Sequence, residues 1–315
     1  MTQLDEAGTL APAPPRAEVP APAPAPARTS APKNPWRYPW RVGGATVGLA
    51  VLFAVGFFVY LFGLSGLSES HAQVTMFKNF VYQLGQATAP IQPFTTVNGK
   101  QVALANGTPV ALLTIPQIGL RNVVVVEGTS SRTLALGPGH ADSSALPGQA
   151  GVSFIYGKAD SYGAPFAHLM QLNRGDKITV ITGQGTATYQ VMSFGTSSTP
   201  APADADNRLV LETAAAGLFP HSAVQVNADL VTPAQPNPND WPAIPPQDSN
   251  MALDSVDGVV PLLLWSQALL LAVIVSTIAT YRWSRWGAWL LMGPAILALV
   301  WCVYENLATL LPNLY

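Results

Sequence analysis

Residues 110–130 have the sequence VALLTIPQIGLRNVVVVEGTS, which is the pattern of two β-strands on either side of a turn. We expect strands at Val110–Pro116 and Asn122–Glu127, because runs of β-branched and apolar residues flank a turn at Ile118–Gly119. The same alternation of short apolar runs and turn residues continues to Val231. The region from Val110 to Val231 therefore predicts a mainly β domain.

Further strands are expected downstream of this hairpin. They lie at 151–157, 177–182, 186–194, 208–213 and 223–230, with turn sequences such as GPG, LPGQAG, RGD and GQG between them. A short helix is expected at 164–172. Seven or more short strands at regular spacing favour a closed barrel or a sandwich.

Three apolar stretches are long enough to cross a bilayer, at 42–64, 259–281 and 286–307. About 20 apolar residues in a helix span the hydrocarbon layer. Hydrophobic residues make up 49% of the 315-residue chain and charged residues only 10%, a balance typical of membrane proteins. The sequence thus predicts three transmembrane α-helices, and the lipid bilayer is one expected partner.

Basic residues predict the orientation of these helices. Arg37 and Arg41 precede the first stretch, and Arg282 and Arg285 lie between the second and the third. Positive flanks remain cytoplasmic. We therefore expect a multi-pass protein of the cell membrane with a cytoplasmic N-terminus and an extracellular β domain.

The remaining segments divide by composition. We expect a disordered Pro/Ala-rich cytoplasmic tail at 1–41, a juxtamembrane helix and connection at 65–107, the β domain at 108–231 and a Pro-rich stalk at 232–255. The juxtamembrane helix is predicted at Ser68–Ala87, capped by Ser68 or Ser70. Its stripe of apolar residues every four positions, Ala72, Met76, Phe80 and Leu84, predicts packing on the β domain.

Several functional classes are disfavoured by composition. The net charge of −2 gives no reason to expect nucleic-acid binding. The four histidines are scattered without metal-ligand spacing, so no metal or cofactor is expected. The chain has one cysteine, Cys302, which excludes an internal disulfide and lies within the third apolar stretch.

The β domain resembles sortases, most closely class E and related actinobacterial forms. The motifs that carry this resemblance are VALLTIPQIGL from residue 110, GPGH at 137–140, LPGQAG at 146–151 and YGAPF at 162–166. The resemblance covers about 120 residues in the expected order. It implies an eight-stranded closed β-barrel that cleaves a sorting signal through a Cys-His-Arg site.

The residues at the family's catalytic positions differ from this pattern. Lys158 follows the strand FIYG where the resemblance implies the histidine, Ala214 ends LVLETA where it implies the cysteine, and Ala223 stands near the arginine position. Acyl transfer needs a nucleophile that can form an acyl-enzyme, and an alanine methyl group cannot do so. We therefore predict that the family's catalytic residues are missing.

A groove inherited from the family is the candidate binding site, with Lys158, Glu212, Ala214 and His140 as candidate members. Glu212 lies two residues before Ala214 and shares its face of the strand, so we hypothesise an ion pair between Glu212 and Lys158. The alternative is that both charges are simply solvated at strand ends.

Three functions remain open from the sequence. The favoured one is a catalytically inactive accessory module of the cell envelope that binds envelope proteins or sorting-signal-like peptides. The second is a cysteine-independent hydrolase or transpeptidase that uses other residues, such as Thr213 or Ser222 with His221 as the base. The third is a purely structural envelope protein.

Overall fold

The computed structural model describes residues 37–97, 100–142, 144–196, 206–215, 222–237, 259–282 and 285–311. Residues 50–315 form one compact unit, to which the contacts below belong. The tail before residue 37, the loop at 197–205 and most of the expected stalk lie outside the described residues.

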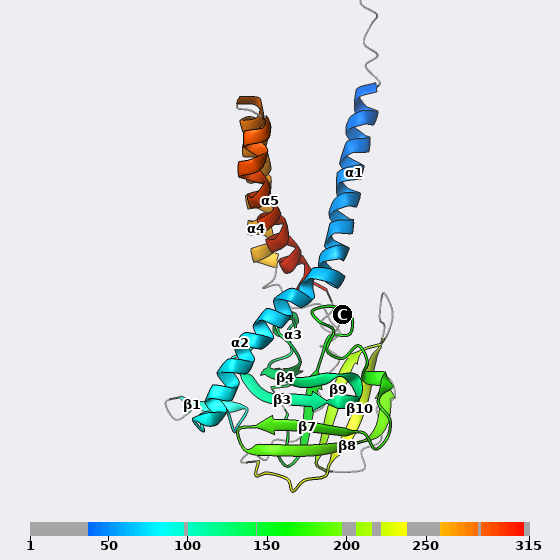
Figure 1. Cartoon of the computed structure of the whole chain (residues 1–315), viewed down its shortest axis with the longest axis vertical. Coiled ribbons are helices and arrows are strands. Elements are labelled where there is room, and N and C mark those ends of the chain that lie inside the picture. Colours follow the sequence, from blue (N-terminus) through cyan, green and yellow to red (C-terminus); the bar gives the residue numbers. More distant parts are fainter. Residues whose placement is uncertain are drawn as a thin grey trace, which may run out of the picture. The chain divides into compact units, whose positions relative to one another are not determined.

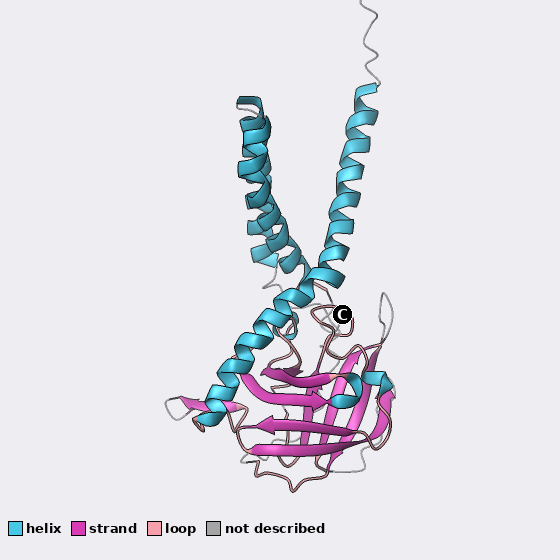
Figure 2. Ribbon diagram, viewed as in Figure 1, coloured by secondary structure: helices cyan, strands magenta, loops and turns pink. Residues whose placement is uncertain are grey.

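Eight strands close into a barrel in the order β10-β8-β7-β3-β4-β5-β6-β9 (Figure 2). Their bounds are β3 Pro109–Ile115, β4 Leu120–Glu127, β5 Gly139–His140, β6 Val152–Tyr156, β7 Lys177–Thr182, β8 Gly185–Thr196, β9 Arg208–Ala214 and β10 Ala223–Leu230. The predicted closed β-barrel is confirmed. Two pairs of neighbours are parallel, β4 with β5 and β6 with β9, and the other pairs are antiparallel.

The barrel interior is filled by alternate residues of these strands. The largest cluster of buried side chains includes Leu113, Ile155, Ile178, Val191 and Leu211, which come from five different strands. Because side chains alternate across a strand, their neighbours point to the outside of the barrel. On β6, on β9 and at the start of β10 these outward residues are buried as well, in a second cluster that contains Tyr156, Val210, Ala214 and Ala223.

Two local expectations were wrong, and one strand was not predicted. A two-stranded sheet, β1 Phe94–Val97 and β2 Lys100–Ala103, lies in the segment expected to be a plain connection. The helix expected at 164–172 is limited to the 3₁₀ turn η3, Leu169–Gln171. Strand β5 was not expected at all, since two residues are too few to show an alternating pattern.

The first two predicted helices form one continuous helical segment. Helix α1 Arg37–Val59 passes through a π-helical turn η1, Tyr60–Leu64, into α2 Ser65–Gly85. The expected cap at Ser68 or Ser70 is wrong: the helix does not begin there, and the Ser70 hydroxyl instead donates to the carbonyl of Gly66 at 2.7 Å. A serine can make this bond inside a helix without ending it.

Helix α2 packs along the outside of the barrel against β3 and β4 (Figure 1). Phe80 is fully buried there with Leu112 and Val124, and Met76, Phe77 and Leu84 pack around them. Gln73 fixes the position of the helix. Its side-chain amide donates to the carbonyls of Val124 and Leu136, and its oxygen accepts from the Val124 amide at 2.8 Å.

Two further helices complete the described chain, α4 Val259–Arg282 and α5 Arg285–Ala308. The structure has three helical segments that are long and apolar enough to cross a membrane, in agreement with the three predicted spans. Near its C-terminal end α5 contacts the first helical segment, where the Tyr304 hydroxyl donates to the carbonyl of Phe53 at 2.8 Å. Tyr60, Leu61, Tyr304 and Ala308 form a buried cluster with Tyr162 of the barrel.

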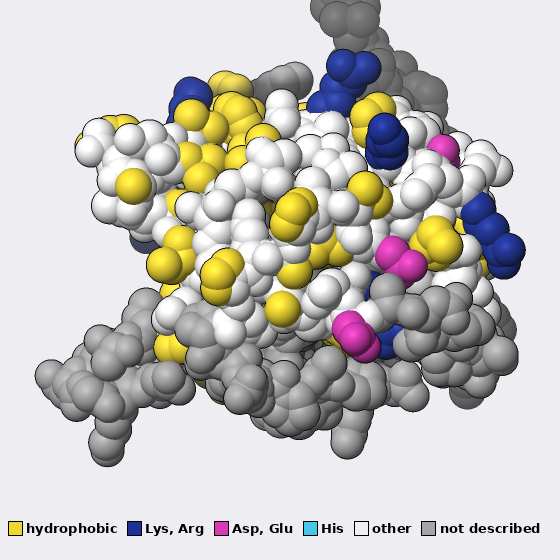
Figure 3. All heavy atoms as spheres, turned by 90° about the horizontal axis from the view of Figure 1, so that it is seen from below, with side chains coloured by type: hydrophobic (Ala, Val, Ile, Leu, Met, Phe, Trp, Pro, Cys, Tyr) yellow, Lys and Arg dark blue, Asp and Glu magenta, His cyan; other side chains and the backbone are white. Residues whose placement is uncertain are grey.

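The barrel surface seen in Figure 3 shows scattered hydrophobic side chains among polar ones. Charged side chains of both signs lie mainly over one half of that view. This visible face carries no large patch of one charge.

Candidate functional site

The three positions where catalytic residues were expected lie at the same end of three neighbouring strands. Ala214, at the end of β9, is the register partner of Ala223, at the start of β10. On the other side of β9, Tyr156 of β6 pairs with Glu212 in parallel, and the amide of Gly157 donates to the carbonyl of Glu212 at 3.0 Å. Lys158 follows directly. The structure therefore brings Lys158, Ala214 and Ala223 close together.

All three side chains are almost inaccessible, with 1% of Lys158, 2% of Ala214 and 0% of Ala223 exposed. The Lys158 ammonium lies 5.4 Å from the centre of the Tyr162 ring. A cation at this distance from an aromatic face is attracted by the quadrupole of the ring. Tyr162 thus covers Lys158 from the side of the loop that follows β6.

This loop has an unusual backbone. Tyr162 and Ala164 adopt positive φ angles of 50° and 45°, which residues with a side chain rarely do. Such conformations persist only where the surroundings hold them in place, and they cluster at functional sites. A hydrogen bond to α2 holds this loop, because the Tyr162 amide donates to the Ser65 hydroxyl at 2.9 Å. Glycine is required at position 163, where a Cβ would lie 2.7 Å from a carboxylate oxygen of Glu69.

Glu212 shares the outward face of β9 with Ala214, as its position in the strand predicts. Its side chain is 7% exposed, and its carboxylate accepts a hydrogen bond from the side-chain amide of Gln225 at 2.8 Å. The ion pair of Glu212 with Lys158 stays a hypothesis. Thr213 points the other way, and its hydroxyl donates to the carbonyl of Gly157 at 2.7 Å.

His140 belongs to a buried polar network that sequence reasoning did not find. Its Nδ1 lies 2.9 Å from a carboxylate oxygen of Glu127, and its Nε2 lies 3.0 Å from the Ser144 hydroxyl. Both His140 and Glu127 are 0% exposed. Glu127 ends β4 and His140 ends β5, and the register of these two strands pairs them, which a single sequence does not show.

The order Ser144, His140, Glu127 has the connectivity of a catalytic triad, but its hydrogen bonds oppose that function. The His140 Nε2 also lies 2.9 Å from the carbonyl oxygen of Ala145, which can only accept a hydrogen bond. Nε2 must therefore carry a proton, and it cannot take one from Ser144. The Ser144 hydroxyl in turn donates to the carbonyl of Ala141 at 2.9 Å. The network is arranged as a buried ion pair rather than as a nucleophile with its base.

The charge state of His140 supports this interpretation. Burial disfavours the imidazolium, but the Glu127 carboxylate and the hydrogen bonds to Glu127 and to the Ala145 carbonyl outweigh it and raise the pKa of His140 above its usual value of 6.5. The structure thus places His140 in the barrel wall, fully buried, where it does not face solvent.

Within the described part of the chain, no group of three or more His, Cys, Asp or Glu side chains is placed to hold a metal ion. The two other candidates for a hydroxyl-based site give no constellation that can be described. His221 lies outside the described residues, and Ser222 is half-buried, with its carbonyl accepting from the Ala215 amide at 2.9 Å.

Residues 113–215 match the family model described as the Sortase domain. The barrel has the sortase fold. The matched segment runs from β3 to the residue after Ala214, so it contains β4 to β9 and the loop with Tyr162. No curated protein sequence matches this chain.

Solved sortase structures resemble part of the chain. Sortase D5 of Clostridium perfringens, described as a transpeptidase, is 18% identical over 51% of this chain and 99% of its own, with a TM-score of 0.41. Sortase E of Streptomyces avermitilis is 27% identical over 41% of this chain and 91% of its own, with a TM-score of 0.36. Sortase E1 of Streptomyces coelicolor, with a tripeptide in its active site, is 25% identical over 41% and 92%, with a TM-score of 0.36.

Proposed function

We propose that this chain is a membrane-anchored, sortase-like protein of the cell surface that binds a peptide or an envelope protein without cleaving it. One observation carries the proposal: the chain has a single cysteine, Cys302, and this residue lies in the membrane-length helix α5. The barrel therefore has no thiol, and alanine occupies position 214, where the resemblance implies the nucleophile.

The neighbouring positions support the same conclusion. A catalytic arginine would stabilise the charge that develops on the substrate oxygen, and removing one such donor typically costs about 10²-fold to 10³-fold in rate. Ala223, the register partner of Ala214, has no donor in its side chain. Lys158 supplies a positive charge, but an alanine methyl group offers it nothing to activate.

A hydroxyl-based enzyme has less support. The Thr213 hydroxyl is engaged with the carbonyl of Gly157, and the Ser144 hydroxyl faces a histidine whose Nε2 already donates to Ala145. The other alternative is a structural protein whose barrel has no ligand. It differs from our proposal only in that the barrel would bind no partner.

The test uses the full chain in nanodiscs and fluorogenic peptides that carry sorting signals. We expect binding, measured by fluorescence anisotropy, without cleavage by the wild type. Cleavage by the wild type would refute the proposal, and the absence of both binding and cleavage would favour the structural alternative.

A gain-of-function variant tests the assignment of positions. Lys158→His, Ala214→Cys and Ala223→Arg together should restore a thioester adduct that mass spectrometry detects. The matched control carries Thr213→Cys in place of Ala214→Cys, because Thr213 and Ala214 are consecutive residues of β9 and point to opposite faces. Equal adduct formation by the control would show that the catalytic positions are wrongly assigned.

A further inference from the structure

We propose that a pocket between the barrel and the membrane-length helices binds the headgroup of a zwitterionic aminophospholipid such as phosphatidylethanolamine. The pocket has a volume of about 350 Å³. Ala214 does not line it, and Tyr162, whose ring lies beside Lys158, is the residue that the two sites share. Its walls come from α2, the short helix α3 (Ser131–Leu134), the Tyr162 loop, α4 and α5. The lining residues that bear on the ligand are Arg132, Tyr162, Pro261, Trp265 and Glu305.

The pocket lies where two membrane-length helices end. Pro261 and Trp265 belong to the first two turns of α4, which begins at Val259, and Glu305 belongs to the last turn of α5, which ends at Ala308. The two helices are 24 residues long, enough to cross the hydrocarbon layer. Their ends therefore lie at the depth of lipid headgroups, which is also where tryptophan side chains are enriched.

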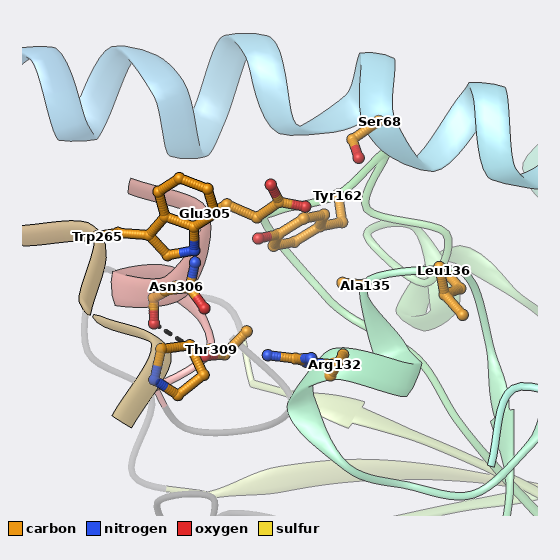
Figure 4. Close-up of a pocket in the computed structure, with 10 residues that line it drawn as sticks. Ser68, Arg132, Ala135, Leu136, Tyr162, Trp265, Glu305, Asn306 and Thr309 are labelled. Atoms are coloured by element: carbon orange, nitrogen blue, oxygen red, sulfur yellow. Dashed lines mark hydrogen bonds between the residues drawn. The ribbon is translucent and has the colours of Figure 1, made fainter. Parts of the chain in front are cut away.

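Two opposite charges enter the pocket from different elements. Figure 4 shows Arg132 reaching in from the barrel side and the Glu305 carboxylate lying beside Tyr162. Both side chains are exposed, and among the residues that the structure describes neither forms an ion pair within 4 Å. Each charge is therefore available to a ligand.

This arrangement matches a headgroup that carries both a phosphate and an ammonium. The guanidinium of Arg132 suits a phosphate, to which it can donate two parallel hydrogen bonds. The Glu305 carboxylate suits a primary ammonium, which is also attracted to the faces of Trp265 and Tyr162. A headgroup with only negative charge would lie against Glu305 and be repelled, which favours the zwitterionic lipid over an anionic one.

The apolar surface beyond the pocket suits the acyl chains. On α4, Leu263 is 56% exposed and Leu264 is 62% exposed, close in sequence to the pocket residues Pro261 and Trp265. A lipid, rather than a soluble phosphate compound, would cover these side chains while its headgroup occupies the pocket.

The test compares phosphatidylethanolamine with phosphatidylglycerol of the same acyl chains, which has the phosphate but lacks the ammonium. Native mass spectrometry of the full chain, released from detergent micelles, measures how much of each lipid is retained. We expect the wild type to retain the ethanolamine lipid about threefold to tenfold better, which corresponds to one charged hydrogen bond in a partly exposed site. Equal retention of both lipids would overturn the proposal.

Variants locate the effect. Glu305→Gln should abolish the preference between the two lipids, and Arg132→Ala should reduce the retention of both. The matched controls are Arg121→Ala and Asp206→Asn, which remove charges that do not line this pocket. A control variant that lowers retention as much as the pocket variants would contradict the assignment. Glycerophosphoethanolamine, which lacks acyl chains, should not displace the lipid at equimolar concentration, and full displacement would mean that the pocket selects a soluble compound.

Discussion

Replacing His140 with alanine should destabilise the barrel far more than replacing Glu127 with glutamine. The two side chains are 0% exposed and 2.9 Å apart. Removing one partner of a buried ion pair typically costs about 3–5 kcal/mol, because the other charge is left without compensation. His140→Ala leaves Glu127 in that state, so we expect a loss in this range.

Glu127→Gln should cost only about 1 kcal/mol, since the hydrogen bonds can be kept. The glutamine amide can donate to Nδ1 of a neutral His140, while Nε2–H continues to donate to the carbonyl of Ala145. The double variant His140→Ala, Glu127→Gln should then be about 2 kcal/mol more stable than His140→Ala alone, because the orphaned carboxylate has been removed.

The pH dependence has a definite sign. Since the folded-state pKa of His140 is raised above 6.5, its contribution to stability is fully present below pH 6.5 and is lost as the pH rises through the folded-state pKa. Desolvation and the Glu127 charge also raise the pKa of Asp142, although this residue is largely exposed. The contribution of Asp142 to stability is therefore present below pH 3.8 and is lost as the pH rises through its raised pKa.

Hydrogen exchange of the β4 and β6 amides in the detergent-solubilised full chain measures these differences as local opening free energies. The wild type should lose stability above pH 6.5, and Glu127→Gln should not. If the double variant is less stable than His140→Ala alone, the pair is not an ion pair and the reasoning fails.

Three further outcomes are expected. Tyr189→Phe should lower the free energy of unfolding by about 1–3 kcal/mol, because it leaves the buried Gly148 amide without the Tyr189 oxygen that accepts from it; an unchanged melting temperature would contradict this. Gln73→Ala should speed exchange of the Val124 amide about tenfold while leaving β7 unaffected, since the side chain accepts from that amide. Gly157→Ala should lower the free energy of unfolding by about 1–3 kcal/mol, because a Cβ there would clash with the Phe166 ring. Gly85→Ala is the control in the same thermal unfolding assay and should be tolerated, because a Cβ there would meet no neighbouring side chain within 4 Å.

The sequence pattern was sufficient for most of the barrel because its strands are long enough to show alternation. The expected strands at 177–182 and 223–230 coincide with β7 and β10. Strand β5 has only two residues, and its pairing with β4 and β6 is decided by tertiary contacts. Similarly, nothing in the sequence distinguishes a π-helical turn at Tyr60–Leu64 from a loop between two helices.

The candidate site was predictable in part for a comparable reason. Each of the three positions lies at or next to the end of a predicted strand, and the resemblance gives the order of these strands along the chain. The positions are Lys158, Ala214 and Ala223. The position of the Tyr162 ring beside Lys158 could not be predicted, because it depends on a positive φ angle and on a hydrogen bond with Ser65 of a helix distant in the sequence. The partners of His140 depend on strand register, which a single sequence does not determine.

The uninterrupted helical segment from Val47 to Gly85 has mechanical consequences. Its 39 residues extend for about 58 Å at 1.5 Å per residue, nearly twice the thickness of the hydrocarbon layer. Force applied to its N-terminal end would therefore be transmitted to β4 through the hydrogen bonds between the Gln73 side chain and the backbone of Val124, because no flexible linker lies between them. Under the proposed function, force on a bound partner would be transmitted through the barrel and this helical segment to the membrane.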